Sequence, residues 1–373
     1  MSRYEVWYTD PLGNRIAYIP NISRLDYVLV AGDVGVARLS TSRRGLPHEA
    51  NNPDYRLAVY RQPYGGASRL EVVAFTDLFS YSTSQDGLSQ FDLGASDLNH
   101  LLKRRIVAYR SGETKADYSS NYVSNSIRNV AARNLGGASD DTARSIQAYG
   151  FSSANATSQG TSIDKQAAWK NCLSLLQDMQ AFSKNDGTEI FFGIVPTSET
   201  TMEFTTWPNQ PGSDRTLSSG VNSMVFSLER GNLLNPSLTY DYSNEANYIY
   251  AGGKGQQDQR NVQEASDDTS IGLSPYARKE KFVSAISGVL DNSDDQVMAK
   301  AKDALIKNRA RVNLSGTIIS TRTAAYGKDW FFGDKVTVDY AGKQFDTVIR
   351  AVSVSVDADG FETIAARVEI SNE

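Results

Sequence analysis

Alternating polar and apolar positions dominate the first hundred residues. Residues 55–60 and 70–75 each alternate with period two, as strands with one buried face do. Residues 61–66 between them contain a proline and two glycines, which favour a tight turn. A short helix is expected after Ser96, which can cap it, and its apolar positions are Leu98, Leu101 and Leu102. The pattern predicts a strand-rich beginning.

The middle of the chain has helical spacing. Residues 123–135 place five apolar side chains on one face, and Gly136-Gly137 provides a stop. Residues 138–161 are rich in Ser, Ala, Thr and Gly and predict a surface loop. A longer helix is expected from Thr161-Ser162 to about Asp186-Gly187. Its apolar stripe is formed by Trp169, Leu173, Leu176, Met179 and Phe182. Residues 190–195 and 202–204 then predict a hairpin.

The last third returns to strands with one helix among them. Ser293 and Gln296 have the spacing of a capping box, and Val297, Ala301, Ala304 and Leu305 follow as a buried stripe. Residues 335–340 predict a strand, and two longer strands are expected to join at residues 357–360. Strand blocks at both ends flank a mixed middle, which predicts an α+β, β-rich chain with two β-rich domains.

Composition excludes several classes of site. The 373 residues correspond to two or three domains at roughly 150 residues each. The 38 Lys and Arg against 43 Asp and Glu give a net charge of −5, which disfavours tight, sequence-independent binding of nucleic acid. Cys172 is the one cysteine, so an intrachain disulfide and a thiolate zinc site are excluded. His48 and His100 are the two histidines. We therefore expect neither a metal nor a cofactor.

The sequence also contains no targeting pattern that we recognise. The first residues lack the apolar stretch of a signal peptide, and no run reaches the roughly 18 apolar residues of a membrane span. These features predict a soluble protein made in a reducing cytoplasm.

Each candidate catalytic motif has a simpler structural interpretation. Cys172 falls within an amphipathic helix, where packing is favoured over nucleophilic catalysis. Residues 357–362 resemble part of a calcium loop, but Asp-Gly between two strands favours a hairpin turn. Residues 251–255 lack the Lys-Ser/Thr end of a phosphate loop, so a turn is favoured.

The charged clusters are interpreted in the same way. Lys103-Arg104-Arg105 closes a short helix, where cations suit the negative end of the helix dipole or a salt bridge between subunits better than DNA binding. Asp267-Asp268 and Asp294-Asp295 are sequence neighbours, which does not place two carboxyls across a cleft. We predict no catalytic, cofactor-binding or metal-binding residue, and a protein that is not an enzyme.

Four stretches together resemble the tail hub proteins, also called baseplate hub or tail-associated proteins, of long-tailed phages of the siphophage type. They are residues 98–107 (LNHLLKRRIV), 231–238 (GNLLNPSL), 246–253 (ANYIYAGG) and 326–338 (YGKDWFFGDKVTV). The resemblance implies two tail-tube-like β-barrel domains with smaller helical and mixed insertions, and a homotrimeric ring. We expect a first barrel-like domain at residues 1–115, completed by later strands, a mixed helical and hairpin domain at 116–230, and a second barrel-like domain at 231–373 with an inserted helix near 293–308.

The function implied is that of a structural hub protein in the virion tail. The ring would link the distal tail tube to the tip and form a channel for DNA ejection, with the distal tail protein, the tape-measure protein and tip or fibre proteins as partners. The acidic balance further predicts a neutral to negative channel lining. Two alternatives stay open. One is a tail-associated cell-wall hydrolase with a carboxylate pair, and the other is a carbohydrate-binding tip adhesin, motivated by 19 Tyr and 4 Trp.

Overall fold

The computed structural model describes residues 2–42, 52–83, 85, 89–108, 113–119, 121–137, 142–154, 157–220, 222–286 and 293–371. The chain forms two compact units. Unit 1 comprises Met1–Leu234 and Thr317–Val368, and unit 2 comprises Asn235–Gly316 with Glu369–Glu373. The three-part division expected at residues 115 and 230 stays a prediction.

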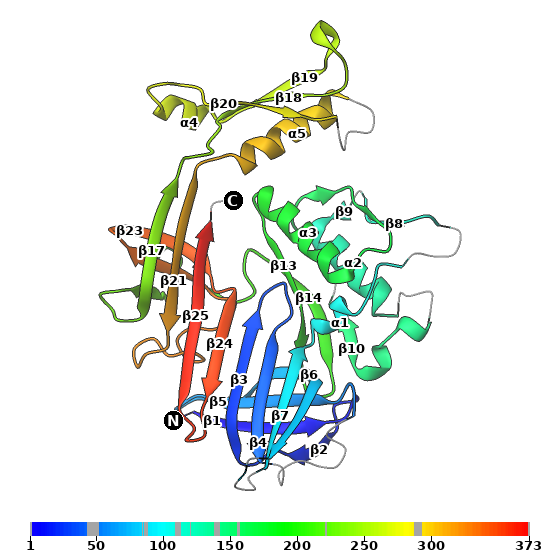
Figure 1. Cartoon of the computed structure of the whole chain (residues 1–373), viewed down its shortest axis with the longest axis vertical. Coiled ribbons are helices and arrows are strands. Elements are labelled where there is room, and N and C mark those ends of the chain that lie inside the picture. Colours follow the sequence, from blue (N-terminus) through cyan, green and yellow to red (C-terminus); the bar gives the residue numbers. More distant parts are fainter. Residues whose placement is uncertain are drawn as a thin grey trace. The chain divides into compact units, whose positions relative to one another are not determined.

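Unit 1 is built on neighbouring strands of an 11-stranded sheet, in the order β25-β24-β3-β4-β7-β6-β5-β1-β2, and β25 is followed by β21 (Arg311–Ile319) and β17 (Leu233–Asp241). In Figure 1, β1 and β5 run across the direction of β3 and β4, so the sheet curls strongly. The strands are β1 (Arg3–Thr9), β2 (Arg15–Tyr18), β3 (Ile22–Val30), β4 (Val36–Ser42), β5 (Arg56–Gln62), β6 (Arg69–Thr83), β7 (Ser89–Asp97), β24 (Ala351–Val356) and β25 (Glu362–Ser371). The strands expected at 55–60, 70–75 and around 357–360 are confirmed.

The expected closed barrels are not confirmed. In the described part of the chain, β2 at one end of the strand order pairs only with β1, so the sheet is open. One inner face is apolar, with Leu25, Leu39, Phe91 and Val354 nearly fully buried. The alternate residues face outward, as in an antiparallel sheet with one solvated side. The chain is thus β-rich, as predicted, and its main sheet keeps free edges.

A smaller sheet in unit 1 surrounds a second group of buried rings. β22 (Lys335–Tyr340) pairs with β23 (Lys343–Val348), β15 (Asp214–Arg215) and β16 (Val225–Ser227). Trp330 is fully buried, 5.7 Å between ring centroids from Phe226 and 4.9 Å from Tyr326. Tyr326 and Trp330 come from the fourth stretch that carries the family resemblance, which therefore has a packing role.

Helices cover a third sheet in unit 1. They are α1 (His100–Lys103), α2 (Val123–Asn134) and α3 (Cys172–Asn185). The sheet has the order β10 (Phe151–Ser153), β14 (Met202–Pro208), β13 (Ile190–Pro196), which confirms the predicted hairpin at 190–204. Two-residue strands complete this region: β8 (Ala116–Asp117) pairs with β12 (Gln166–Ala167), and β9 (Asn121–Tyr122) pairs with β11 (Ser162–Ile163).

The helix expected to follow Thr161-Ser162 begins at Cys172 instead. Residues 162–163 and 166–167 pair as strands instead, and Asn171 caps α3 by accepting the backbone N–H of Ser174. Trp169 lies before the helix with φ of 58° and is 61% exposed, so its place in the apolar stripe was wrong. The β pairing outweighs local helical spacing here.

Two smaller predictions were also wrong. Ser96 does not cap α1, because it belongs to β7 and the helix begins after Asn99. Residues 138–161 are not simply a loop, since β10 runs parallel to β14 and buries Phe151. Residues 138–141 and 155–156 of that stretch lie outside the described residues.

Unit 2 is a three-stranded sheet with one helix on it. The strand order is β19 (Val262–Ser266), β18 (Tyr248–Gly252), β20 (Glu280–Ser284). α5 (Asp294–Lys307) begins after Ser293, as predicted, and Val297, Ala301 and Ala304 are buried with Ile249 and Ala251 of β18. α4 (Asp268–Leu273) is a shorter helix in the same unit. The chain leaves unit 1 along β17 (Leu233–Asp241) and returns along β21 (Arg311–Ile319).

Candidate functional site

A buried network of ion pairs connects strands of the unit 1 sheet that do not pair through their backbones. Arg61 on β5 is 1% exposed. Its Nη2 lies 3.0 Å from Glu362 Oε1 on β25, and both Nη atoms donate to the carbonyl oxygen of Tyr326 at 3.3 Å. Glu71 on β6 lies 3.8 Å from Arg61 and 2.7 Å from Arg69. Strands that are distant in the sheet order are therefore joined by side chains.

Hydrogen bonds decide the charge of Glu362 in this network. The hydroxyl of Tyr4 donates to Oε2 at 2.6 Å, and that of Ser2 donates to Oε1 at 2.7 Å. Burial alone would raise the pKa of Glu362, but the bonds from Arg61, Tyr4 and Ser2 outweigh burial and lower it. The carboxylate stays ionised, and the network serves to hold the curl.

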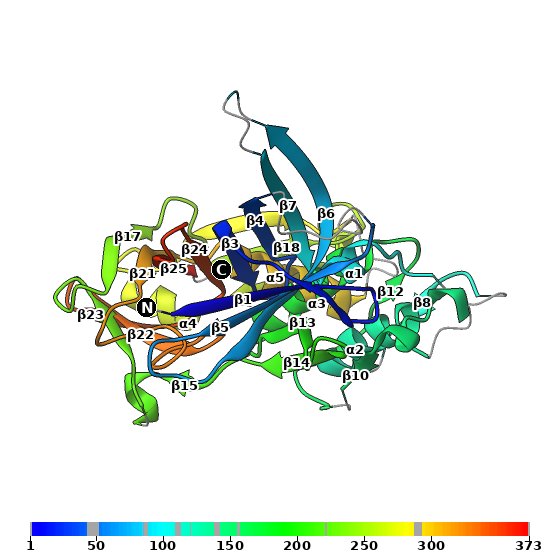
Figure 2. The ribbon, with the colours of Figure 1, turned by 90° about the horizontal axis from the view of Figure 1, so that it is seen from below.

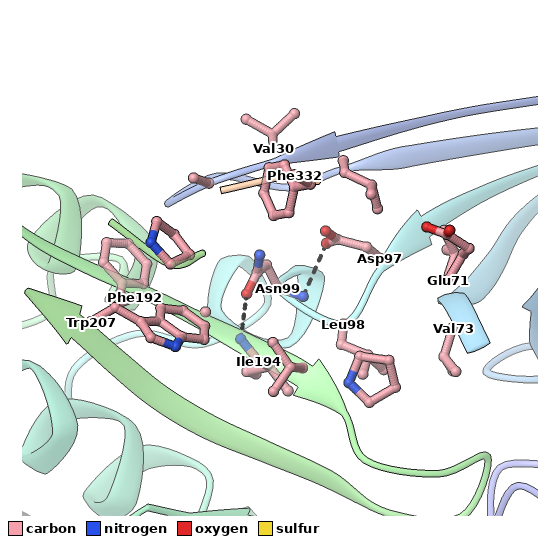
Figure 3. A pocket seen from close by; sticks show the side chains of 17 residues that line it. Val30, Glu71, Val73, Asp97, Leu98, Asn99, Phe192, Ile194, Trp207 and Phe332 are labelled. Carbon is pink, nitrogen blue, oxygen red and sulfur yellow. Dashed lines mark hydrogen bonds between the residues drawn. The ribbon is translucent and has the colours of Figure 1, made fainter. Parts of the chain in front are cut away.

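A cavity of about 240 Å³ lies beside α1 in unit 1 (Figure 3). Asn99, which is 5% exposed, organises its wall. The side-chain oxygen of Asn99 accepts the N–H of Ile194 at 2.8 Å, and its Nδ2 donates to the carbonyl of Asp33 at 2.8 Å. The Asn99 N–H donates to Asp97 Oδ1 at 3.0 Å. This asparagine therefore links the β7–α1 corner to β13.

Two carboxyl groups line this cavity, but they have different surroundings. Burial raises the pKa of Asp97 to about 7, while hydrogen bonds from Gly35 and Asn99 oppose the rise. Glu71 is held by Arg69 and Arg61, and the Tyr326 hydroxyl donates to it at 3.4 Å. Most other lining residues are apolar, including Phe192, Trp207 and Phe332. The volume is below the roughly 300 Å³ of ordinary ligand sites, so the cavity does not favour the hydrolase alternative.

The outward side of β25, β24, β3, β4 and β7 forms a second candidate, which we call the polar face. It is rich in small hydroxyl residues, including Ser40, Ser353, Ser355 and Thr363. Among the side chains that the structure describes, its charged residues are Arg24, Asp26, Arg38, Asp92 and Arg367, three positive and two negative.

Hydrogen bonds fix both carboxylates of the polar face. Ser355 donates to Asp26 Oδ1 at 2.5 Å, and Arg24 Nε lies 2.5 Å from Asp26 Oδ2. Ser40 and Gln90 both donate to Asp92 Oδ1, at 2.5 and 2.8 Å. The result is a hydrophilic surface with little net charge.

The β6–β7 hairpin extends beyond its neighbour β5. The last β5 partner of β6 is Phe75, whereas β6 pairs with β7 as far as Thr83. Residues 77–83 of β6 have no strand on their other side within the described chain. Leu78 is 64% and Tyr81 is 52% exposed there. Figure 2 shows this hairpin standing out from the rest of unit 1. A free edge of this kind can pair with another chain.

The face of the unit 2 sheet opposite α5 carries a row of aromatic rings, of which Tyr248 is buried and Phe282 is 53% exposed. Tyr248, Tyr250 and Phe282 lie on neighbouring positions of β18 and β20, opposite the face that holds α5. The guanidinium of Arg278 lies 3.8 Å from the Tyr248 ring centroid, and that of Arg260 lies 4.9 Å from the Phe282 centroid. Rings beside hydrogen-bonding groups can stack on planar or sugar ligands.

The motifs weighed from the sequence have structural places. Cys172 is 1% exposed at the start of α3, and burial raises its pKa to about 12, so it packs as a thiol. Asp357 Oδ1 accepts the N–H groups of Asp359 and Phe361 in the predicted turn. Arg104 pairs with Asp54 and Asp77 inside unit 1. Asp267 caps α4, and Asp294-Asp295 begin α5.

Other expectations concern absences or undescribed residues. His48 lies outside the described residues. Within the described ranges, no group of three or more His, Cys, Asp or Glu side chains is placed to hold a metal ion. No helix in the described part of the chain has the length and apolar character to cross a membrane. The Arg61 network was not predicted, because residues about 300 positions apart leave no local signal.

Solved structures with this fold include tail proteins from bacteria and prophages. The 43 kDa tail protein of prophage MuSo2 from Shewanella oneidensis has a TM-score of 0.55 and 12% identity over 98% of this chain and 98% of its own. A tail protein from Neisseria meningitidis has a TM-score of 0.54 and 12% identity over 98% of this chain and 96% of its own. The prophage tail protein gp18 from Listeria monocytogenes has a TM-score of 0.50 and 10% identity over 98% of this chain and 94% of its own. At these identities the likeness establishes the fold.

Among curated proteins, none matches the chain. A family model described as siphovirus ReqiPepy6 Gp37-like protein matches residues 67–368, which include most of both units. The match agrees with the resemblance to siphophage tail proteins that the sequence carries. The chain therefore belongs to the siphovirus ReqiPepy6 Gp37-like protein family.

Proposed function

We propose that this protein is a structural hub subunit of a phage tail, and that three copies form a ring between the distal tube and the tip. Its likeness to tail proteins over nearly the whole length supports the class. The observation that carries the ring is the outer part of the β6–β7 hairpin, which extends beyond β5 and exposes Leu78 and Tyr81. A second copy would pack against these exposed side chains.

The polar face is our candidate for the channel lining. Small hydroxyl side chains make a smooth, hydrated surface, and the two aspartates balance most of the arginine charge. A surface with clustered, unpaired cations would bind phosphates and slow the passage of DNA. The sequence predicted a neutral to negative channel lining. The polar face, with three arginines and two aspartates among its described side chains, would make the lining nearly neutral.

The remaining roles follow from the same proposal. The ring would contact the distal tail protein, the tape-measure protein and tip or fibre proteins, and would reside in the virion tail. Residues 1–115 and 231–373 would provide the two tube-like surfaces of each copy, with 116–230 between them. No residue is assigned a catalytic role, and no cofactor is required.

Light scattering after size-exclusion chromatography, combined with negative-stain images, tests the ring. We expect three times the 40.9 kDa chain mass and particles with three-fold symmetry. A protein that stays monomeric at concentrations of tens of micromolar, with no symmetric particles, would contradict the proposal. Turnover of purified peptidoglycan by the chain alone would support the hydrolase alternative instead.

One observation favours a second candidate, a glycan-binding tip protein. Among the aromatic side chains of the unit 2 sheet, Phe282 is 53% exposed. The neighbouring Tyr250 hydroxyl donates a hydrogen bond to Glu280 at 3.4 Å. Aromatic faces next to carboxylates are suited to sugar rings and hydroxyls. A glycan array with the wild type and Phe282→Ala separates the candidates: loss of a specific signal in the variant supports the adhesin, and no signal removes it.

A further inference from the structure

A second cavity in unit 1, of about 440 Å³, is lined by three arginines on an otherwise largely apolar wall. We call it the arginine cavity. The cations are Arg56, Arg104 and Arg105, and Asp54 is the single acidic residue of the lining. The apolar part is formed by Pro11, Pro53, Phe75, Leu101, Ile146 and Met202, with Tyr149 beside them.

Arg56 is the unusual member, because its charge is buried without an anion. The residue is 3% exposed, and Nη2 donates to the carbonyl of Pro11 at 2.5 Å. Its Nε has no hydrogen-bond partner among the described residues. The described chain also gives Arg56 no ion pair, and the guanidinium lies 5.3 Å from the Phe75 ring centroid. Burial lowers the pKa of Arg56, which reflects the cost of the unpaired charge.

The nearby acids are already engaged. Asp54 and Asp77 pair with Arg104, and Asp77 Oδ1 lies 3.4 Å from its Nη2. Asp10, which exerts some attraction on Arg56, accepts hydrogen bonds from the backbone of Leu12 and from Asn14. Arg105 donates to the carbonyl of Arg144 at 3.4 Å, and no described residue forms an ion pair with it. Among the described lining residues, Asp54 is the one carboxylate, and it pairs with Arg104.

We propose that the arginine cavity binds a carboxylate that is attached to an apolar group. The carboxylate would be held by the positive charges of Arg56 and Arg105, while the apolar body would contact Phe75, Leu101 and Met202. A guanidinium with a free N–H suits a planar carboxylate. The apolar lining favours such a ligand over inorganic phosphate, which would bury most of its oxygens without donors.

Two sources could supply this group, a small organic acid or the C-terminal carboxylate of a neighbouring tail protein. Calorimetry with full-length protein separates them by two probes, N-acetylphenylalanine and the dipeptide acetyl-Leu-Phe. Each is compared with its C-terminal amide, which lacks the charge. Tighter binding of N-acetylphenylalanine indicates a small organic acid, and tighter binding of acetyl-Leu-Phe indicates the C-terminus of a protein. Either result supports the site.

The variant Arg56→Met tests the residue that carries the inference. Replacing a buried, unpaired charge by an apolar side chain of similar length is expected to leave the protein folded. We expect acids to bind the wild type at least tenfold more tightly than their amides, and Arg56→Met to lose at least tenfold. Arg105→Gln should weaken binding less, and the exposed Arg230→Gln should leave it unchanged. The proposal is overturned if acids do not bind the wild type, bind no better than amides, or bind Arg56→Met equally well.

Discussion

Asp97 makes the stability of unit 1 sensitive to pH. Its pKa of about 7 in the folded protein exceeds the ordinary value near 4. The folded state thus binds more protons than the unfolded state between these values, and this residue lowers stability as pH rises from about 4 to 7. Asp97→Asn removes the ionisation and keeps an acceptor for the Asn99 N–H. We expect the variant to gain about 1–3 kcal/mol in unfolding free energy at pH 8.

Urea unfolding at pH 5 and pH 8 measures this effect. The gain should shrink at pH 5, where the wild-type carboxyl is already protonated in the folded state. The exposed Asp359→Asn serves as a matched control and should show no such difference. A variant that is destabilised equally at both pH values would indicate that Asp97 is needed as a charge, contrary to this argument.

Glu362 has the opposite pH dependence. Its lowered pKa means that the stabilisation it provides is present above the unfolded value near 4.5 and is lost as pH falls through the folded value. Glu362→Gln leaves Arg61, which is 1% exposed, without its closest carboxylate. We expect a loss of about 2–4 kcal/mol at pH 7, because Glu71, 3.8 Å away and shared with Arg69, compensates the buried Arg61 charge only in part. Thermal unfolding measures it, and Glu229→Gln on the surface should cost almost nothing.

At the level of single residues, the sequence predicted packing better than polar contacts. Cys172 was correctly interpreted as a buried apolar residue, because its neighbours Leu173 and Leu176 show the helical stripe. Asn99 and Arg61 gave no such signal, since their partners Ile194 and Glu362 are remote in the chain. The unpaired Arg56 could not be found either, because burial of a charge depends on tertiary packing.

At the level of elements, the exposed part of β6 provides a direct test of assembly. Leu78 and Tyr81 are 64% and 52% exposed, and the Tyr81 ring centroid lies 4.5 Å from that of Phe91, so lysines at both positions should lower the stability of one chain by about 1 kcal/mol. The double variant should nevertheless stay monomeric in sedimentation velocity, since charges on a strand edge oppose pairing with another chain.

Tyr64→Lys is the control for that experiment. Tyr64 is 81% exposed in the turn between β5 and β6, away from the free edge. This variant should assemble like the wild type. If the double lysine variant forms the same oligomer, the β6 edge is not the contact between copies.

Strong periodicity predicted elements correctly, and long-range pairing explains the failures. α2, α5, β13 and β24 lie where their apolar patterns indicated. The beginning of α3 and the strand β10 were not predicted correctly, because residues 162–167 and 151–153 pair with strands that are distant in sequence. The loop-like composition before α3 conceals those partners. Length was also underestimated for β6, whose outer half has no buried face to produce alternation.

At the level of the whole molecule, the open sheet gives a physical reason for assembly. The Arg61–Glu362 network holds the curl without hydrogen-bonded closure, so the polar face and the β6 edge stay available to other copies. The sequence resemblance predicted barrel-like domains, but it could not distinguish closure within one chain from closure between chains. Both arrangements bury the same alternating residues.

The charge balance of the polar face determines how the assembled ring should interact with DNA. Asp26→Asn with Asp92→Asn keeps acceptors for Ser355 and Ser40 but removes both aspartate charges from the polar face. We expect the wild-type ring to bind a fluorescent DNA duplex weakly at 150 mM salt, and the double variant to bind at least tenfold more tightly. The gain should fall steeply as salt increases, because released counterions drive phosphate binding. Asp357→Asn with Asp359→Asn removes the same charge from the β24–β25 turn as a control. Equal DNA binding by both double variants would mean that net charge alone matters, and that the polar face does not line the channel.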